Sequence, residues 1–262
     1  MICGKRLGIQ KISTYKRQMI KLLYSFYNLI FSNDIESFSA KLIQNLKKKK
    51  NKITVIDIGC YVGNFSKKIN QNLNNKNVFF YMIDPNKNIL KDLNKLKIKK
   101  KFFSYAIDSE SNYKTLFFNN AFPASGTSLS NIYYKSKGYN ISRKLFFLFN
   151  KKKNFFIKKK VKTISLDNFV KTQKIKRVDI LKIDTEGNEE NILINSKYAL
   201  EKTKVLTLEL LSKKEDEKDK FDRINNFLKK KNFILKYKKR IYSTSIFTNL
   251  ICYDLIYLNR NI

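Results

Sequence analysis

The apolar residues of the chain change their spacing near residue 50, and this change divides the sequence into two parts. Over residues 1–50 they recur at helical intervals, and Asp34 is suited to cap a helix. One face of that helix would collect Phe38, Leu42, Ile43 and Leu46. From residue 53, short apolar runs alternate with helical patterns. The spacing predicts an N-terminal helical arm over 1–50 and one large α/β domain over 51–262.

The α/β domain contains short apolar runs of the kind that form buried strands. They cover residues 53–58, 78–83, 102–107, 178–184 and 205–210. Helical patterns lie between and after them, over 64–73, 86–96, 188–199 and 215–231. Strands separated by helices of about ten residues predict βαβ units and a parallel sheet. Two last strands, over 233–237 and 250–258, are far enough apart to form a long hairpin.

The middle of the chain interrupts this rhythm. A small strand is expected over 115–118, and a strand end followed by a helix start over 163–170. Residues 133–160 are basic and aromatic without a clear period. We therefore interpret 119–160 as an insertion or lid over the sheet, and not as a separate domain. Residues 133–160 would either hold an anionic glycan carrier or form a plain solvated insertion, and both interpretations stay open.

The formal net charge is +34, from 55 lysines and arginines and 21 acidic residues. Such an excess is typical of proteins that bind nucleic acids or anionic membranes. Here most of the excess is lysine, and asparagine and isoleucine are also frequent, which an AT-rich genome would produce. Arginine, the better phosphate ligand, is scarce. We expect no specific nucleic-acid partner, and peripheral contact with an anionic membrane stays open.

The chain has no histidine, which excludes imidazole bases, histidine-containing catalytic triads and histidine metal ligands. Its three cysteines are scattered and form no CxxC pair, so we expect no zinc ribbon and a reducing, cytoplasmic location. No apolar run reaches the roughly 18 residues that cross a membrane. Segment 19–31 contains Lys21 and Asn28, which favours a packed helix over a signal peptide, with a membrane-surface helix as the alternative.

Two of the seven glycines lie in one turn after the first strand, in the pattern D-x-G-x-x-x-G over 57–63. Glycine allows a tight turn and a close approach to a ligand, and the next helix would present free N–H groups. The pattern is neither the G-x-G-x-x-G of most dinucleotide folds nor a P-loop. It predicts a cofactor site, with an ordinary tight turn as the alternative.

The next two strand ends extend this site. The second strand ends in Asp84, before Pro85, where an acid accepts hydrogen bonds from both ribose hydroxyls in doubly wound folds. Capping of the following helix is the alternative role. The third strand ends at Ala106, Ile107 and Asp108, where Ile107 would contact an adenine ring. These positions together predict an adenosine-containing cofactor.

Six sequence strings carry a resemblance to a known family. They are V-I-D-I-G-C-Y-V-G-N (55–64), I-D-P-N (83–86), Y-A-I-D (105–108), T-I-S-L-D-N-F (163–169), L-K-I-D-T-E-G-N-E (181–189) and T-L-E-L (207–210). In this order the chain resembles the FkbM family of methyltransferases, within the class I S-adenosylmethionine-dependent fold. The string K-I-D-x-E-G-x-E is the most specific part. Asp84 replaces the family's usual glutamate before proline, and Cys60-Tyr61 replace its alanine and asparagine.

The resemblance implies a three-layer Rossmann-like sandwich with a seven-stranded, mostly parallel sheet whose last strand is antiparallel. It implies S-adenosylmethionine as cofactor and methyl transfer to an oxygen, commonly a hydroxyl of a sugar, glycan or small metabolite. The alternative is an RNA methyltransferase or RNA-binding protein that uses the positive charge. The residues we assign to the cofactor are Asp57, Gly59, Tyr61, Gly63, Asp84, Ala106, Ile107 and Asp108.

Three acidic residues are assigned to catalysis: Asp184, Glu186 and Glu209. Asp184 and Glu186 follow a central strand, where they would attract the sulfonium cation, orient the acceptor or accept its proton. Helix capping and metal chelation are the alternatives, and we expect no metal. Glu189 falls in the first turn of the next helix, and Lys182 either pairs with a carboxylate or borders the substrate.

Overall fold

The computed structural model describes residues 35–46, 52–74, 77–119, 127–135, 156–241 and 249–262. The N-terminal part of the predicted arm, with its cap Asp34, lies outside the described residues. So does most of the predicted insertion, including residues 136–155. None of the helices in the described ranges is both long and apolar enough to cross a membrane.

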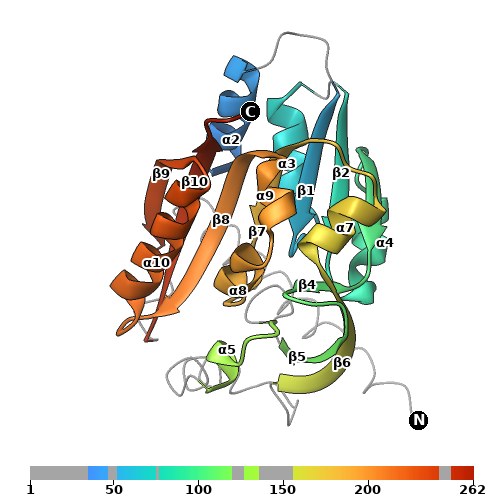
Figure 1. Ribbon diagram of the computed structural model, residues 1–262. Coiled ribbons are helices and arrows are strands. Elements are labelled where there is room, and N and C mark those ends of the chain that lie inside the picture. Colours follow the sequence, from blue (N-terminus) through green and yellow to red (C-terminus); the bar gives the residue numbers. More distant parts are fainter. Residues whose placement is uncertain (1–34, 47–51, 75–76, 120–126, 136–155, 242–248) are drawn as a thin grey trace, which may run out of the picture. The chain divides into compact units, whose positions relative to one another are not determined.

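Seven strands form the main sheet, in the order β3-β2-β1-β7-β8-β10-β9 (Figure 1). Their bounds are β1 Ile53–Ile58, β2 Val78–Ile83, β3 Lys99–Phe103, β7 Val178–Ile183, β8 Thr203–Lys213, β9 Phe233–Ile241 and β10 Leu250–Asn259. The first five pair in parallel, and β10 is antiparallel to both β8 and β9. The predicted mostly parallel sheet with an antiparallel last strand is confirmed.

Helices cover both faces of this sheet and complete a three-layer sandwich. One face packs against α2 (Ile35–Leu46), α3 (Asn64–Asn72), η1 (Lys87–Ile89) and α4 (Leu90–Asn94). The other packs against α7 (Leu166–Thr172), α8 (Glu189–Ile194), α9 (Lys197–Glu201) and α10 (Glu217–Lys230). Successive strand residues point to opposite faces. Val205 therefore packs under α2, α3 and α4, and the next residue, Leu206, packs under α7 to α10. Burial on both faces explains the continuous apolar strand sequences.

A second sheet has the order β4-β6-β5 and lies beyond the carboxyl ends of β1 and β7 (Figure 1). It consists of β4 (Ala106–Asp108), β5 (Tyr113–Asn119) and β6 (Phe156–Ser165), and the short helix α5 (Ile132–Lys135) adjoins it. β6 pairs in parallel with β4 and antiparallel with β5. The predicted strand over 115–118 is thus confirmed as part of β5.

The structure divides two of the predicted elements. The predicted strand 102–107 is divided, because the chain leaves the main sheet after Phe103 and enters the second sheet at Ala106. The Tyr105 ring between them packs 6.3 Å from the ring of Phe169, which turns the chain onto α7. The predicted helix 188–199 is likewise two helices, α8 and α9, because the Ser196 hydroxyl donates to the Ile192 carbonyl where α8 ends.

Candidate active site

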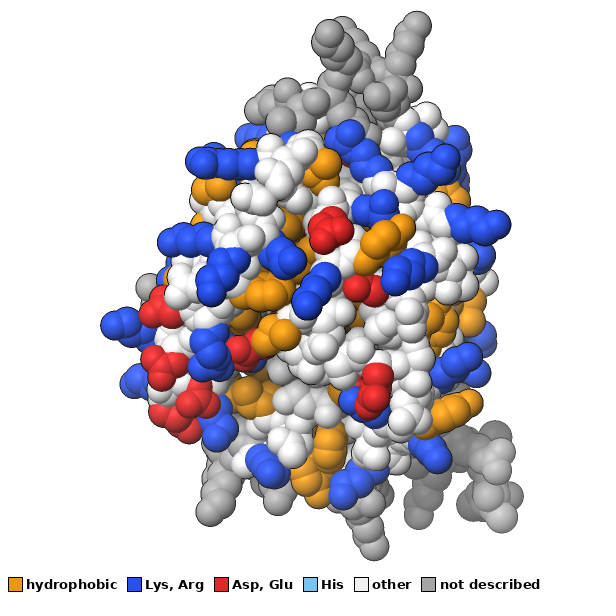
Figure 2. Space-filling model, viewed as in Figure 1, with side chains coloured by type: hydrophobic (Ala, Val, Ile, Leu, Met, Phe, Trp, Pro, Cys, Tyr) orange, Lys and Arg blue, Asp and Glu red, His pale blue; other side chains and the backbone are white. Residues whose placement is uncertain are grey.

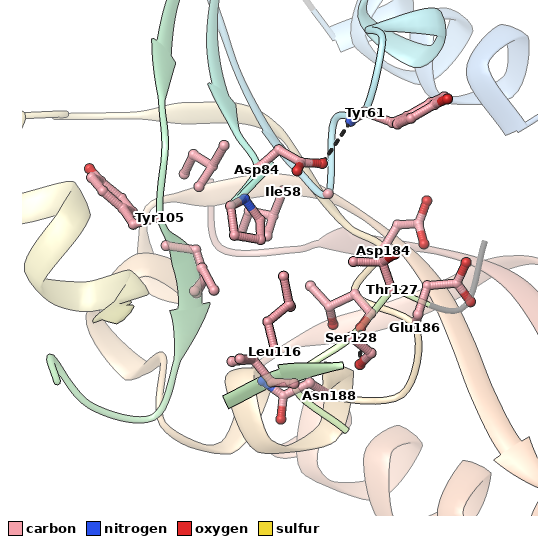
Figure 3. Close-up of a pocket in the computed structure, with 17 residues that line it drawn as sticks. Ile58, Tyr61, Asp84, Tyr105, Leu116, Thr127, Ser128, Asp184, Glu186 and Asn188 are labelled. Atoms are coloured by element: carbon pink, nitrogen blue, oxygen red, sulfur yellow. Dashed lines mark hydrogen bonds between the residues drawn. The ribbon is translucent and has the colours of Figure 1, made fainter. Parts of the chain in front are cut away.

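A pocket lies at the carboxyl ends of β1, β2 and β7 (Figure 3). β1 and β7 are neighbours, and the chain continues from them toward opposite edges of the sheet. Open α/β sheets bind ligands at such a reversal of strand order. The residues that line the pocket come from both sheets. The topology therefore places the glycine loop, Asp84 and the Asp184 loop around one cavity.

Gly59 forms the tightest part of the pocket wall. Its φ is +73°, and a Cβ at this position would lie 1.7 Å from the carbonyl oxygen of Asp184. The loops after β1 and β7 therefore touch through backbone atoms alone. Gly63 also has a positive φ, +80°, but its missing Cβ faces Leu96 and Met82 side chains. Gly63 thus caps α3 and packs on the core without lining the pocket.

Asp84 lines the pocket and accepts two backbone hydrogen bonds. The N–H of Tyr61 donates to its Oδ2 at 3.0 Å, and the N–H of Asn86 to its Oδ1 at 2.8 Å (Figure 3). Each oxygen keeps a second lone pair for a ribose hydroxyl, so the carboxylate fits the predicted role. Burial raises the pKa of Asp84 to about 6, although the two N–H groups favour the ionised form. Tyr61 lines the pocket beside it.

The raised pKa of Asp84 predicts a pH dependence of cofactor binding. Ribose hydroxyls donate to the ionised carboxylate, so affinity should fall as the pH drops through about 6. At pH 5 about one site in eleven would be ionised, which weakens S-adenosylhomocysteine binding roughly ten-fold relative to pH 7.5. Calorimetric titration at both pH values measures this change. Asp84→Asn should bind weakly at both pH values, and Asp92→Asn, at an exposed position, should match the wild type.

Apolar side chains form the wall beyond Asp84. Ala106 and Ile107 line the pocket, as expected for residues beside an adenine, and Leu116 of β5 faces them. Tyr105, which our sequence analysis did not assign to the site, also lines the pocket. Burial raises the pKa of its hydroxyl to about 12, so the ring stays neutral. Its position at the start of the Y-A-I-D string was the signal that pointed to it.

Asp108 lies behind this wall and does not line the pocket. It is 2% exposed, and the Lys114 ammonium lies 2.6 Å from its Oδ2. The amides of Asn188 and Asn191 donate to its Oδ1 at 3.2 and 2.5 Å. These contacts join β4 to α8. Asp108 therefore holds the adenine wall in place from behind.

Lys182 is the buried cation beneath the pocket. Its Nζ donates to Asp184 Oδ2 at 2.9 Å and to the Gly59 carbonyl at 3.3 Å, and it lies 3.5 Å from Asp57 Oδ1. Burial lowers the pKa of Lys182, but Asp184 and Asp57 more than offset this and raise it. The open choice for Lys182 is thus settled in favour of carboxylate pairing. Asp57 is fully buried, accepts a hydrogen bond from Ser66 and does not line the pocket, so it contacts the site through this ion pair.

Asp184 and Glu186 line the opposite end of the pocket from Tyr105 (Figure 3). Glu186 has a φ of 57°, so the loop turns sharply there and both carboxylates point to one side. Glu209 does not line the pocket, and it faces Asp254 across β8 and β10. Burial, with Asp184 and Asp254 nearby, raises the pKa of Glu209 well above its usual value. Among the described residues no acidic or cysteine side chains group as metal ligands.

Glu189 fixes the loop that carries these acids. It is the first residue of α8, as predicted, but its side chain turns back toward the loop. Its Oε1 accepts hydrogen bonds from the backbone N–H groups of Thr185 and Gly187, at 3.1 and 2.8 Å. Ser128 adds a bond to the Thr185 carbonyl at 2.8 Å. The last glutamate of K-I-D-x-E-G-x-E is therefore a positioning residue for Glu186.

Comparison with known proteins agrees with this geometry. The family model described as methyltransferase FkbM domain matches residues 57–235. No curated protein matches the sequence. Among solved structures, methyltransferase FkbM from Methylobacillus flagellatus is 12% identical with a TM-score of 0.44, and the match covers 80% of this chain and 45% of that one.

Two other solved structures are similar to this chain. A putative RNA methyltransferase from Pyrococcus horikoshii is 14% identical, with a TM-score of 0.40 and 86% and 82% of the two chains covered. The plantazolicin methyltransferase BpumL, in complex with SAH, is 12% identical, with a TM-score of 0.43 and 92% and 90% covered. The family match spans most of the chain. The chain belongs to the methyltransferase FkbM domain family.

Proposed function

We propose that the protein transfers a methyl group from S-adenosylmethionine to a hydroxyl oxygen of a sugar, glycan or small metabolite. The observation that carries this proposal is the pair Asp184 and Glu186 at one end of the pocket. Asp84 and the wall of Tyr105 and Ile107 occupy the other end. An adenosine held between Asp84 and Ile107 would direct the rest of the cofactor toward the two acids.

The side chains then have separate tasks. When bound, S-adenosylmethionine supplies a methyl group on a positively charged sulfur, which is a good leaving group. Asp84 and the apolar wall fix its position, and alignment of two reactants can supply much of the rate acceleration. The Lys182 ammonium lies 2.9 Å from Asp184 Oδ2 and holds this carboxylate in place. Asp184 would therefore orient the acceptor hydroxyl and stabilise the nearby positive charge.

The acceptor hydroxyl loses its proton as its oxygen forms the new bond to carbon. The chain has no histidine to take that proton. Glu186 lines the pocket next to Asp184, and its loop is held by Glu189, so it is the side chain best placed to act as base. A hydroxyl acceptor fits a carboxylate base, because the carboxylate both accepts the hydrogen bond and receives the proton.

Glu186→Gln is expected to lower kcat by about 10²-fold or more, since general bases typically contribute 10²–10⁴. The affinity for S-adenosylhomocysteine should change less than about three-fold, because Asp84 and the apolar wall hold the nucleoside. Labelled methyl transfer and calorimetry measure the two effects. Glu201→Gln, at an exposed position on α9, is the control and should leave both unchanged. An unchanged kcat in Glu186→Gln would remove Glu186 from the mechanism.

The acceptor class can be tested directly with methyl-labelled S-adenosylmethionine. Free sugars, nucleotide sugars, extracted glycans and total RNA would be incubated with the full chain. We expect label in a sugar-containing fraction, and we expect it to resist mild alkali, which hydrolyses methyl esters but not methyl ethers. Label in RNA alone, or label released by alkali, would contradict hydroxyl methylation.

We also propose that the protein is located in the cytoplasm, and cell fractionation would test this location.

A further inference from the structure

The second sheet has a lysine-rich side next to the pocket. Alternate residues of β6 point to the same side, and so do the β5 residues directly opposite them. The register pairs Lys158 with Phe117 and Lys162 with Tyr113. We call this side the lysine face; it consists of Lys158, Lys160, Lys162, Tyr113 and Phe117, with Tyr134 of α5 packed on Phe117.

The charge of the lysine face is not neutralised within the structure. Its three lysines are exposed, and no acidic side chain of the described ranges pairs with them. A few lysines elsewhere pair with an acidic side chain, as Lys213 does with Glu215. Acidic side chains gather mainly where α10 lies, whereas lysines spread over the rest of the visible face (Figure 2). Three like charges, about 7 Å apart along one strand, repel one another until an anionic partner offsets them.

Exposed apolar side chains accompany these charges. Of six large hydrophobic residues that are exposed in the described part of the chain, Tyr113 and Tyr134 lie with the lysine face, and Ile157 of β6 points to the other side of the sheet. The ammonium of Lys160 lies 5.5 Å from the Tyr113 ring centroid, and that of Lys158 lies 5.7 Å from the Tyr134 centroid. Tyrosine rings with lysines beside them suit the headgroup region of a bilayer. Single-stranded RNA would instead need open ring faces for stacking, and here lysines cover them.

The lysine face is connected to the pocket through β5. Leu116, on the other side of that strand, lines the pocket. The N–H of Phe117 donates to the Ser128 carbonyl at 2.8 Å, and Ser128 also lines the pocket. The lysine face is therefore the side of β5 opposite the one that lines the pocket, and a surface bound to it would lie one strand away from the site.

We propose that the lysine face docks the protein on a lipid bilayer that carries anionic headgroups. Each ammonium group near such a surface strengthens binding, and the tyrosine rings anchor the protein at the interface. This docking does not depend on the reaction that the pocket performs. The further consequence, that the methyl acceptor is held at the bilayer, rests on the function proposed above.

The test uses the full chain and vesicles of phosphatidylcholine, with or without 30% phosphatidylglycerol, in about 0.15 M salt to screen weak attraction. Sedimentation measures the bound fraction. We expect binding to the anionic vesicles only. Reversal of Lys158, Lys160 and Lys162 to glutamate should weaken it at least ten-fold. The same reversal of Lys218, Lys229 and Lys230, exposed on α10, should weaken it less than three-fold.

A second measurement uses the absence of tryptophan from the chain. Tyr113→Trp places a single fluorophore on the lysine face, and Leu90→Trp places one at an exposed position on α4. Anionic vesicles should shift the emission of the first to shorter wavelength and leave the second unchanged. Equal losses in both triple variants, no binding by the wild type, or equal shifts would overturn the proposal. The proposal would also be overturned if the lysine-face variant lost its binding to oligouridine but still bound the anionic vesicles.

Failure of the docking proposal and failure of the proposed function give different results. The vesicle assays need neither a methyl donor nor an acceptor. If labelled methyl groups appear in sugars while vesicles are not bound, the docking surface is wrong and the reaction stands. If vesicles are bound through the lysine face while only RNA is methylated, the acceptor is wrong and the docking surface stands.

Discussion

Gly59→Ala is expected to abolish cofactor binding and to lower the free energy of unfolding by about 3 kcal/mol or more. The added Cβ would lie 1.7 Å from the Asp184 carbonyl oxygen, so the two loops of the pocket would have to separate. The positive φ of +73° adds strain for any residue with a Cβ. Urea unfolding and calorimetry with S-adenosylhomocysteine measure the two losses.

Gly63→Ala is the matched control for this experiment. Its φ of +80° imposes a similar backbone strain, but the nearest atoms are the ends of the Leu96 and Met82 side chains, at 2.5 and 2.8 Å. Such side chains can move, so a loss of about 1–2 kcal/mol is expected, with cofactor affinity retained within a few-fold. If Gly59→Ala were no more damaging than Gly63→Ala, contact between the loops would not be what requires glycine.

The central strands of the main sheet were predictable because they are buried on both faces. β1, β2 and β7 are continuous apolar runs, and the structure places each within one residue of its predicted bounds. Only the end of β6, from residue 163, was predicted, and the rest of this strand was missed for the opposite reason. Half of its residues are exposed, and Lys158, Lys159 and Lys160 follow one another without any alternation of apolar and polar residues. The pairing of β6 with β5, and not its own sequence, makes it a strand.

Pocket residues at strand ends were predictable, whereas contacts between distant segments were not. Gly59, Asp84, Ile107 and Asp184 all follow or end strands, and all line the pocket. Lys182 lies beneath the glycine loop because β7 pairs with β1. These two strands are more than a hundred residues apart in the sequence. A single sequence shows a lysine in a buried strand, but only the strand order identifies its partners.

The ion pair beneath the pocket leads to the second large prediction. Lys182→Met would leave Asp57, which is fully buried, and Asp184 without their cation. Removing one partner of a buried pair costs about 3–5 kcal/mol, because the remaining charge is uncompensated. Asp184 would also lose the contact that keeps it oriented, so kcat should fall as well. Urea unfolding at pH 8 and labelled methyl transfer measure these effects.

Lys204→Met is the control for the loss of a buried lysine as such. Lys204 is 8% exposed, and its Nζ donates to the Asn259 carbonyl at 3.0 Å instead of to a carboxylate. We expect a loss of about 1–2 kcal/mol, the usual cost of one unsatisfied buried acceptor. Asp57→Asn should partly rescue Lys182→Met, because it removes the charge that the lysine neutralised.

The pH dependence of Lys182→Met separates lost charge compensation from lost packing. Without the cation, an ionised carboxylate in this buried place costs free energy that a protonated carboxyl does not. The folded variant then binds more protons than the unfolded one, so its stability decreases as the pH rises above about 4. The deficit relative to the wild type should therefore be larger at pH 8 than at pH 5. A deficit that is equal at both pH values would mean that Lys182 stabilises the fold through its methylene groups, and that the carboxylates of the pocket do not depend on its charge.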